Sequence, residues 1–128
     1  MDAPARVLVA DDEEDIRLLV TLAVRRAGCS VVAAVADGAE ALAAARAELP
    51  DLVVLDVSMP GATGLEVCAA LRAEPSTAGC RVLLLSAGAS PHDVARGLAA
   101  GADAYLPKPF TVAGLVAQVR LLTAGDAA

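Results

Sequence analysis

The sequence predicts one doubly wound α/β domain, in which a five-stranded parallel sheet is flanked by five helices. Two patterns support this fold class. Short, continuous apolar runs recur five times along the 128 residues, and each is followed by a segment whose apolar residues return every three or four positions. Continuous runs are typical of strands buried on both faces of a parallel sheet, and the longer spacing is typical of amphipathic helices.

The predicted strands and helices alternate along the whole chain. The strands are expected at 6–10 (RVLVA), 30–35 (SVVAAV), 51–55 (DLVVL), 81–85 (RVLLL) and 104–106 (AYL). Helical spacing is clearest in three sets of residues: Ile16, Leu19, Val20 and Ala23; Leu65, Cys68 and Leu71; and Leu115, Val119 and Leu122.

The expected helix ends carry capping residues. Three pairs have the spacing of an N-terminal capping pair: Asp37 with Glu40, Thr63 with Glu66, and Ser90 with Asp93. Pro91 then stands at a first helical position, where its missing N–H costs nothing. Gly28 and Gly101 follow helical segments, as left-handed terminators do, and Pro75 ends the third helix.

The composition narrows the class of protein. Hydrophobic residues make up 57% of the chain, yet no apolar run reaches the ~18 residues of a membrane span. The start of the chain, 1–6 (MDAPAR), lacks the features of a signal peptide, so we expect a cytoplasmic location. The three cysteines are far apart and never form CxxC, which predicts reduced thiols. The formal net charge of −6 argues against direct binding to nucleic acid or to a membrane surface.

The notable polar residues all fall where predicted strands end. They are Asp11 and Asp12 after the first strand, Asp56 after the third, Ser86 after the fourth and Lys108 after the fifth. In an open α/β sheet, the carboxyl ends of the strands line the ligand crevice at the topological switch point. We therefore expect these residues to converge, although they are up to about a hundred positions apart in the sequence.

Such a cluster has a definite chemistry. Two like charges 4 Å apart cost ~4 kcal/mol at an effective dielectric constant near 20, so three gathered carboxylates call for a cation. Oxygen ligands suit Mg²⁺, which leaves coordination positions for a phosphoryl group. Asp56 is then a plausible nucleophile, with Lys108 neutralising charge and the Ser86 hydroxyl donating a hydrogen bond. Lys108 is also the one lysine among ten basic residues.

At these residues the sequence resembles the receiver domains of two-component response regulators. The matching stretches are 7–17 (VLVADDEEDIR), 51–67 (DLVVLDVSMPGATGLEV), 82–88 (VLLLSAG) and 101–110 (GADAYLPKPF). The resemblance implies a CheY-like, flavodoxin-like (βα)₅ fold with strand order 2-1-3-4-5 over residues 1–123. Residues 124–128 are expected to form a short tail, and no output domain is expected.

The resemblance also implies roles for single residues. Asp56 would be the phosphoacceptor for a histidine kinase or a phosphotransfer protein. Asp11, Asp12, Asp56 and the backbone carbonyl of Ser58 would hold Mg²⁺, while Ser86 and Lys108 would contact the phosphoryl group. Tyr105 would be an aromatic switch residue that follows Ser86, and the Lys108–Pro109 bond would be cis. The only reactions that the protein would catalyse are transfer of the phosphoryl group onto Asp56 and its hydrolysis from Asp56. The output would be an unidentified protein partner at the face of the fourth helix, fifth strand and fifth helix.

One departure from the resemblance concerns that face. Receivers of the OmpR-like class carry an acidic pair at the fifth strand, with Glu and Arg on the last helix. Here Ala104, Gly114 and Gln118 stand at matching places, and only Asp103 and Arg120 are left. The charged dimer face of that class is therefore not expected.

Two other functions stay open. The chain could be a receiver-like module that binds partners without phosphorylation, although its complete set of site residues argues against this. It could also be a Mg²⁺-dependent phosphatase, which would need a general acid near Asp56. Position 58 lacks the second Asp of an Asp-x-Asp phosphatase, and Glu66 is expected to face elsewhere. We interpret 13–15 (EED) as solvated acids of a first helical turn and His92 as an exposed residue.

Overall fold

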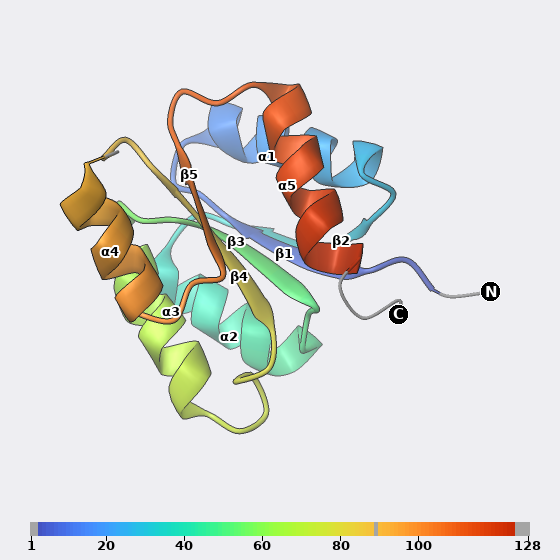
Figure 1. Ribbon diagram of the computed structural model, residues 1–128. Helices are drawn as coiled ribbons and strands as arrows, with labels where there is room; N and C mark the ends of the chain where they lie inside the picture. Colours follow the sequence, from blue (N-terminus) through green and yellow to red (C-terminus); the bar gives the residue numbers. More distant parts are fainter. Residues whose placement is uncertain (1–2, 89, 125–128) are drawn as a thin grey trace.

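The computed structural model describes residues 3–88 and 90–124, and in them the predicted alternation of strands and helices is confirmed. The strands are β1 (Arg6–Ala10), β2 (Ser30–Val35), β3 (Leu52–Asp56), β4 (Arg81–Ser86) and β5 (Ala104–Pro107). The helices are α1 (Glu14–Arg26), α2 (Gly38–Glu48), α3 (Gly64–Ala73), α4 (Pro91–Ala99) and α5 (Val112–Ala124). All strand pairs are parallel and the order is β2-β1-β3-β4-β5, as expected (Figure 1).

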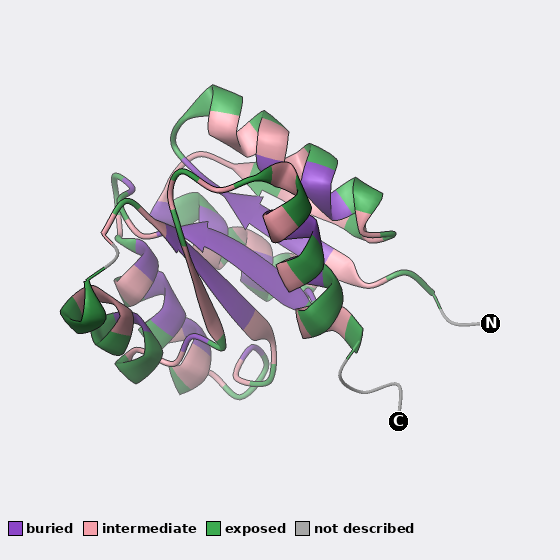
Figure 2. Cartoon of the chain, turned by 45° about the horizontal axis from the view of Figure 1, so that its top comes forward, coloured by how far each residue is buried: buried purple, intermediate pink, exposed green. Residues whose placement is uncertain are grey.

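The sheet lies between two helical layers, each with its own apolar core. Helices α1 and α5 cover one face, while α2, α3 and α4 cover the other (Figure 1). The first core joins β-strand side chains to Val20 and Val24 of α1 and Leu115 of α5. The second joins them to α2 and α3, including Leu71. Figure 2 shows the central strands as the most deeply buried part of the chain. This double coverage explains why the strands are continuously apolar.

Three strands end one residue later than the sequence predicts: β3 at Asp56, β4 at Ser86 and β5 at Pro107. Asp56 is the last residue of β3 and pairs with Leu85, and Ser86 is the last residue of β4 and pairs with Pro107. The apolar pattern stops at the preceding residue, but the ladder with the neighbouring strand continues. Polar residues of the site are thereby held by the sheet itself.

The expected helix caps are confirmed. The side chains of Asp37 and Ser90 accept hydrogen bonds from the third residue of their helices, and Thr63 forms a full capping box with Glu66. Gly28 and Gly101 both have positive φ, at 86° and 109°. One residue that ends a helix in the left-handed conformation was not predicted from the sequence.

That residue is Leu49, which ends α2 in the left-handed conformation with φ 48°. Pro50 follows it, and a residue before proline disfavours the helical conformation. The helix therefore has to end there even though the sequence offers no glycine. A leucine in this conformation is uncommon, because only glycine adopts it without steric cost.

Other expectations concern the ends and the thiols. Ala124, which the sequence assigned to a tail, is the last residue of α5, and residues 125–128 lie outside the described residues. The three cysteines are free, as predicted, and Cys68 is buried. Among the described residues, no helix combines the length and the hydropathy that crossing a bilayer requires.

Candidate functional site

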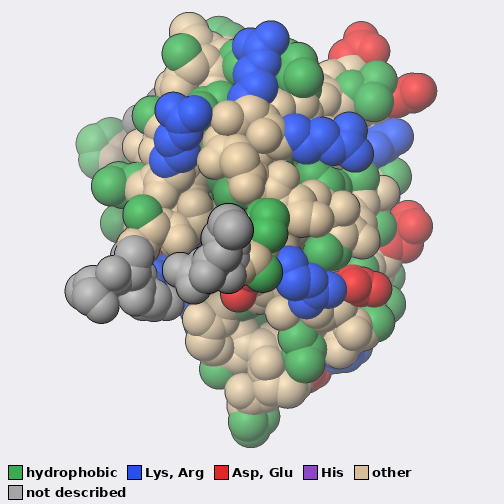
Figure 3. Space-filling model, turned by 90° about the vertical axis from the view of Figure 1, so that its right-hand side faces the viewer, with side chains coloured by type: hydrophobic (Ala, Val, Ile, Leu, Met, Phe, Trp, Pro, Cys, Tyr) green, Lys and Arg blue, Asp and Glu red, His purple; other side chains and the backbone are tan. Residues whose placement is uncertain are grey.

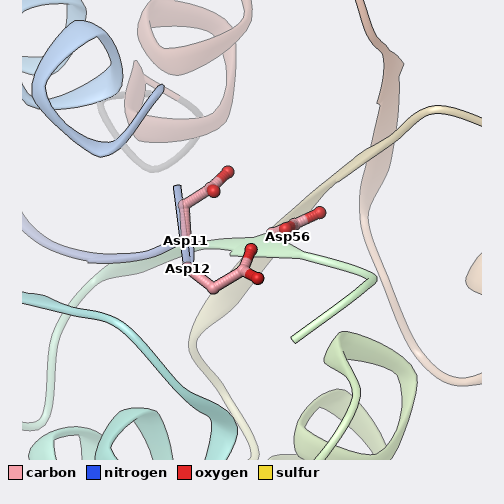
Figure 4. Close-up of side chains that lie close together, drawn as sticks. All are labelled: Asp11, Asp12 and Asp56. Carbon is pink, nitrogen blue, oxygen red and sulfur yellow. The ribbon is translucent and has the colours of Figure 1, made fainter. Parts of the chain in front are cut away.

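Three carboxylates meet beyond the ends of β1 and β3. Asp11 and Asp12 follow β1 directly, and Asp56 ends the neighbouring strand β3. One carboxylate oxygen from each residue lies within 4.8 Å of the other two (Figure 4). Asp11 is fully buried and Asp56 is 3% exposed, whereas Asp12 is exposed. The parallel pairing of β1 with β3 thus produces the acidic cluster that the sequence predicts.

Lys108 reaches this cluster from the end of β5. Its Nζ atom lies 3.1 Å from Oδ2 of Asp11 and 3.4 Å from Oδ1 of Asp56. The backbone N–H of Lys108 donates to the carbonyl of Ser86, which ties the residue to the end of β4. The Lys108–Pro109 bond is cis, as expected. Residues separated by 97 positions are therefore in direct contact.

The cluster changes the acidity of its members. Burial raises the pKa of Asp56 to about 6, and the charge of Asp11 adds to the rise. The charge of Lys108 and the N–H of Ser58 act in the opposite direction. Burial lowers the pKa of Lys108, but the carboxylates of Asp11 and Asp56 outweigh it, so that pKa is raised overall. The site thus favours a cation near Asp56 and keeps the ammonium group charged.

Asp11 is held in a fixed orientation by several donors. Its Oδ1 atom accepts from the N–H of Glu13, and its Oδ2 atom accepts from Lys108. The guanidinium of Arg17 donates to its backbone carbonyl at 2.9 Å. A buried carboxylate with this many partners has little freedom to move.

One acidic neighbour of the site is not evident from the sequence. Glu13 is expected only to be a solvated acid, but its Oε1 atom lies 3.9 Å from Nζ of Lys108. Its side chain is 65% exposed, so the contact is weak in energy. Nothing in the run DDEED distinguishes Glu13 from its neighbours, because the contact depends on where β5 delivers Lys108.

Ser86 and Tyr105 are linked through one residue that the sequence did not single out. The N–H of Gly88 donates to Oγ of Ser86 at 3.1 Å. The hydroxyl of Tyr105 donates to the carbonyl of the same Gly88. The two predicted switch residues, Ser86 and Tyr105, therefore share Gly88 as a partner in the loop after β4.

Ser58 lies two residues after Asp56, and its N–H donates to Oδ1 of Asp56 at 3.3 Å.

A comparison with known families decides what this arrangement belongs to. The family described as the response regulator receiver domain matches residues 7–120, which include the whole acidic cluster, Ser86 and Lys108. The chain belongs to this family. It is a receiver domain of two-component signalling.

Relatives with known names agree with this assignment. The receiver is 44% identical over 93% of its length to the probable transcriptional regulatory protein TcrX of Mycobacterium tuberculosis. It is 47% identical over 91% of its length to the transcriptional regulatory protein PrrA of Mycobacterium bovis, and 42% identical over 90% to the DNA-binding response regulator MtrA of Mycobacterium tuberculosis. These matches cover 50%, 49% and 49% of the relatives, so the receiver spans about half of their length.

Solved structures match the receiver over almost its full length. A putative response regulator from Chloroflexus aurantiacus has a TM-score of 0.88 and 35% identity, covering 95% of this chain and 99% of that one. The receiver domain of the putative response regulator NarL from Mycobacterium tuberculosis has a TM-score of 0.87 and 38% identity, covering 98% and 99%. The chemotaxis protein CheY4 of Vibrio cholerae has a TM-score of 0.85 and 37% identity, and the match covers 94% of this chain and 99% of that one. The CheY-like fold is thus confirmed.

Proposed function

We propose that this receiver accepts a phosphoryl group on Asp56 from a histidine kinase or a phosphotransfer protein, with Mg²⁺, and that phosphorylation switches a protein-interaction face formed by α4, β5 and α5. The observation that carries the proposal is the convergence of Asp11, Asp12, Asp56 and Lys108 at one end of the sheet. Acidic residues without a special role are mostly exposed, so two buried carboxylates beside a lysine need an explanation. A phosphoryl-transfer site provides one, because it consists of charged groups held in fixed positions.

The chemistry assigns a task to each residue. A carboxylate oxygen of Asp56 attacks the phosphorus, and the bond to the donor's leaving group breaks. Lys108 neutralises charge on the phosphoryl oxygens, and the Ser86 hydroxyl donates a hydrogen bond to one of them. Asp11, Asp12, Asp56 and the carbonyl of Ser58 would hold Mg²⁺, which would offset the charge that gathers during transfer. Hydrolysis of the aspartyl phosphate by water returns Asp56 to its starting form.

The switch follows from the hydrogen bonds around Gly88. When the Ser86 hydroxyl turns toward a phosphoryl oxygen, its bond with the N–H of Gly88 is weakened. Gly88 also holds the Tyr105 hydroxyl, so a shift of this loop moves the Tyr105 side chain on β5. Phosphorylation in this way biases an equilibrium between two arrangements of the α4–β5 region.

Partners and location are part of the proposal. We expect a histidine kinase or phosphotransfer protein upstream, a protein target downstream, a cytoplasmic location, and no direct contact of this domain with nucleic acid or membrane. On the face in Figure 3, basic side chains stand apart among hydrophobic and acidic ones, and no continuous basic surface is drawn. A net charge of −6 also disfavours binding to phosphate backbones.

The phosphatase alternative is weakened by the position of Glu66. Its Oε1 atom accepts from the N–H of Thr63 at 3.0 Å, so its carboxylate serves the capping box of α3. A general acid for a separate substrate would have to face Asp56.

A direct test uses a small phosphodonor. The purified receiver, incubated with Mg²⁺ and labelled acetyl phosphate, is expected to incorporate phosphate that hydroxylamine removes. Borohydride releases the phosphate and reduces the acyl group to the alcohol of homoserine, and peptide mass spectrometry should find this change at Asp56. Asp15→Asn, which removes an exposed acid of α1, serves as the matched control and should be labelled like wild type. No labelling, or labelling at another residue, would overturn the proposal.

Mg²⁺ affinity is expected to depend on pH. The pKa of Asp56 is about 6 without metal, so protons compete with the ion below that value and not above it. Between pH 7.5 and pH 5 we expect the Kd for Mg²⁺, measured by calorimetry, to rise about tenfold, since one pH unit below the pKa leaves about a tenth of the group ionised. An affinity that stays constant over this range would count against Asp56 as a ligand.

A further inference from the structure

The aromatic ring of Tyr105 occupies the space where a side chain at position 97 would lie. Gly97 is buried in α4 on the side that faces the sheet. A Cβ atom at Gly97 would lie 2.9 Å from Cδ2 and 3.1 Å from Cε2 of Tyr105, and 3.1 Å from a methyl carbon of Leu84. Carbon atoms in favourable contact are about 3.5–4.0 Å apart. Helix α4 can therefore rest on the ring only because residue 97 has no side chain.

No backbone requirement explains this glycine. Gly28, Gly61 and Gly101 have positive φ, but Gly97 is an ordinary helical residue between Arg96 and Leu98. Inside a helix, glycine is less favourable than every residue except proline. The close approach of the Tyr105 ring is thus the feature of the structure that accounts for glycine at this position.

The ring is fixed on its other sides as well. Tyr105 packs against the apolar core that α2, α3 and the sheet form. At its far end, the hydroxyl donates to the carbonyl of Gly88, whose N–H bonds Ser86. Helix α4, the core and the loop after β4 together hold the ring in a single place. Of these three supports, the surface at Gly97 is the one that any larger residue would remove.

We propose that Gly97 is the positioning residue for Tyr105, and that its missing side chain keeps the Tyr105 hydroxyl at Gly88. The inference rests on the proposed function, in which Tyr105 reports the state of Ser86. In that role Gly97 sets the balance between two positions of the ring. A side chain at position 97 would turn the ring away from Gly88 or lift α4 from β5. The three atoms that a Cβ at Gly97 would meet most closely belong to Tyr105 and Leu84, not to Asp56 or Lys108, so phosphorylation would continue while the ring lost its position at Gly88.

The protein carries its own reporter for a test. Tyr105 is the one tyrosine and there is no tryptophan, so intrinsic emission near the tyrosine band comes from this ring alone. In Gly97→Ala we expect acrylamide quenching of that emission to rise about twofold, because a half-buried ring becomes exposed. Acetyl phosphate should still label Asp56 to the wild-type extent. Gly79→Ala is the matched control, since a Cβ there meets nothing within 4 Å.

The two readouts separate this inference from the function on which it rests. If wild type is not labelled at Asp56, the proposed function fails, whatever Tyr105 does. If labelling is normal and Tyr105 is quenched equally in wild type and Gly97→Ala, the role of Gly97 is wrong.

A second measurement removes the ring instead of adding a side chain. Gly97→Ala should lower stability in the wild-type background, where the ring blocks the new methyl group. In a Tyr105→Ala background the same change should raise stability, because alanine favours a helix more than glycine does. Urea denaturation of the four proteins gives the coupling between the two positions. If Gly97→Ala alone does not fold, recovery of folding in the double variant supports the same conclusion. An equal effect in both backgrounds would overturn it.

Discussion

Replacing Asp56 with Asn is expected to abolish phosphorylation of the receiver and, without metal, to make the folded protein more stable. Asn has no carboxylate oxygen to attack phosphorus, so acetyl phosphate should leave no acyl phosphate on the variant. At pH 7 the wild-type protein keeps Asp56 ionised although burial and Asp11 raise its pKa from 3.8 to about 6. A shift of this size lowers the free energy of unfolding of the wild-type protein at pH 7 by about 2–3 kcal/mol, and the variant avoids this loss.

The sign of the pH dependence provides the check. Because the pKa of Asp56 is higher in the folded state, its contribution to stability is fully present below pH about 4 and is lost as the pH rises through about 6. In urea denaturation with EDTA, the free energy of unfolding of Asp56→Asn should therefore exceed that of wild type most above pH 7, and the difference should nearly vanish at pH 4. Asp15→Asn, at an exposed acid, should show neither effect. If metal-free Asp56→Asn is less stable than wild type at pH 7, the ionised carboxylate of Asp56 does not destabilise the folded protein, and the prediction is wrong.

The convergence of the site could be predicted because it depends on periodicity alone. Continuous apolar runs identify parallel strands, and parallel strands deliver their last residues to one edge. This places Asp11, Asp56 and Lys108 together without knowledge of any side-chain contact. The helix caps were predictable for a similar reason, since each depends on residues three positions apart, as in Thr63 and Glu66.

The contacts that could not be predicted are those between segments whose relative distance the sequence does not encode. The approach of Glu13 to Lys108 and the bond from Tyr105 to Gly88 both depend on how loops from different strands pack. The close approach of Gly97 to Tyr105 is of the same kind. A glycine in a sequence shows that space or unusual backbone geometry is needed, but it does not show which neighbour needs it.

The face of α4, β5 and α5 illustrates how structure sharpens a sequence expectation. Asp103 is one of the two charged residues left at positions that the OmpR-like class uses for dimers. In the structure its Oδ2 atom accepts from the guanidinium of Arg72 at 2.8 Å and from the N–H of Val82 at 2.7 Å. Arg72 also donates to the carbonyl of Gly101. The carboxylate of Asp103 thus binds its own chain, which leaves it less able to pair with a second receiver.

Gly64→Ala should cause a large loss of stability and of Mg²⁺ affinity together. A Cβ at Gly64 would lie 2.4 Å from the carbonyl oxygen of Asp56 and 2.9 Å from the Cα of Val57. Both neighbours are backbone atoms at the strand end that carries Asp56, so they cannot move aside as a flexible side chain could. We expect urea denaturation to show a loss of about 2–4 kcal/mol, and Asp56 to be displaced from the cluster.

Two comparisons separate displacement of the site from simple destabilisation. Gly79→Ala adds the same methyl group in open space and should stay within about 0.5 kcal/mol of wild type. Leu71→Ala removes a fully buried side chain of α3 and should cost about 2–5 kcal/mol, a loss similar to that of Gly64→Ala. Leu71 lies in the core and not at the strand end, so its variant should bind Mg²⁺ like wild type when measured under folding conditions. If both destabilised variants bind Mg²⁺ equally well, the contact between Gly64 and Asp56 does not position the site; weaker binding by Gly64→Ala alone would mean that it does.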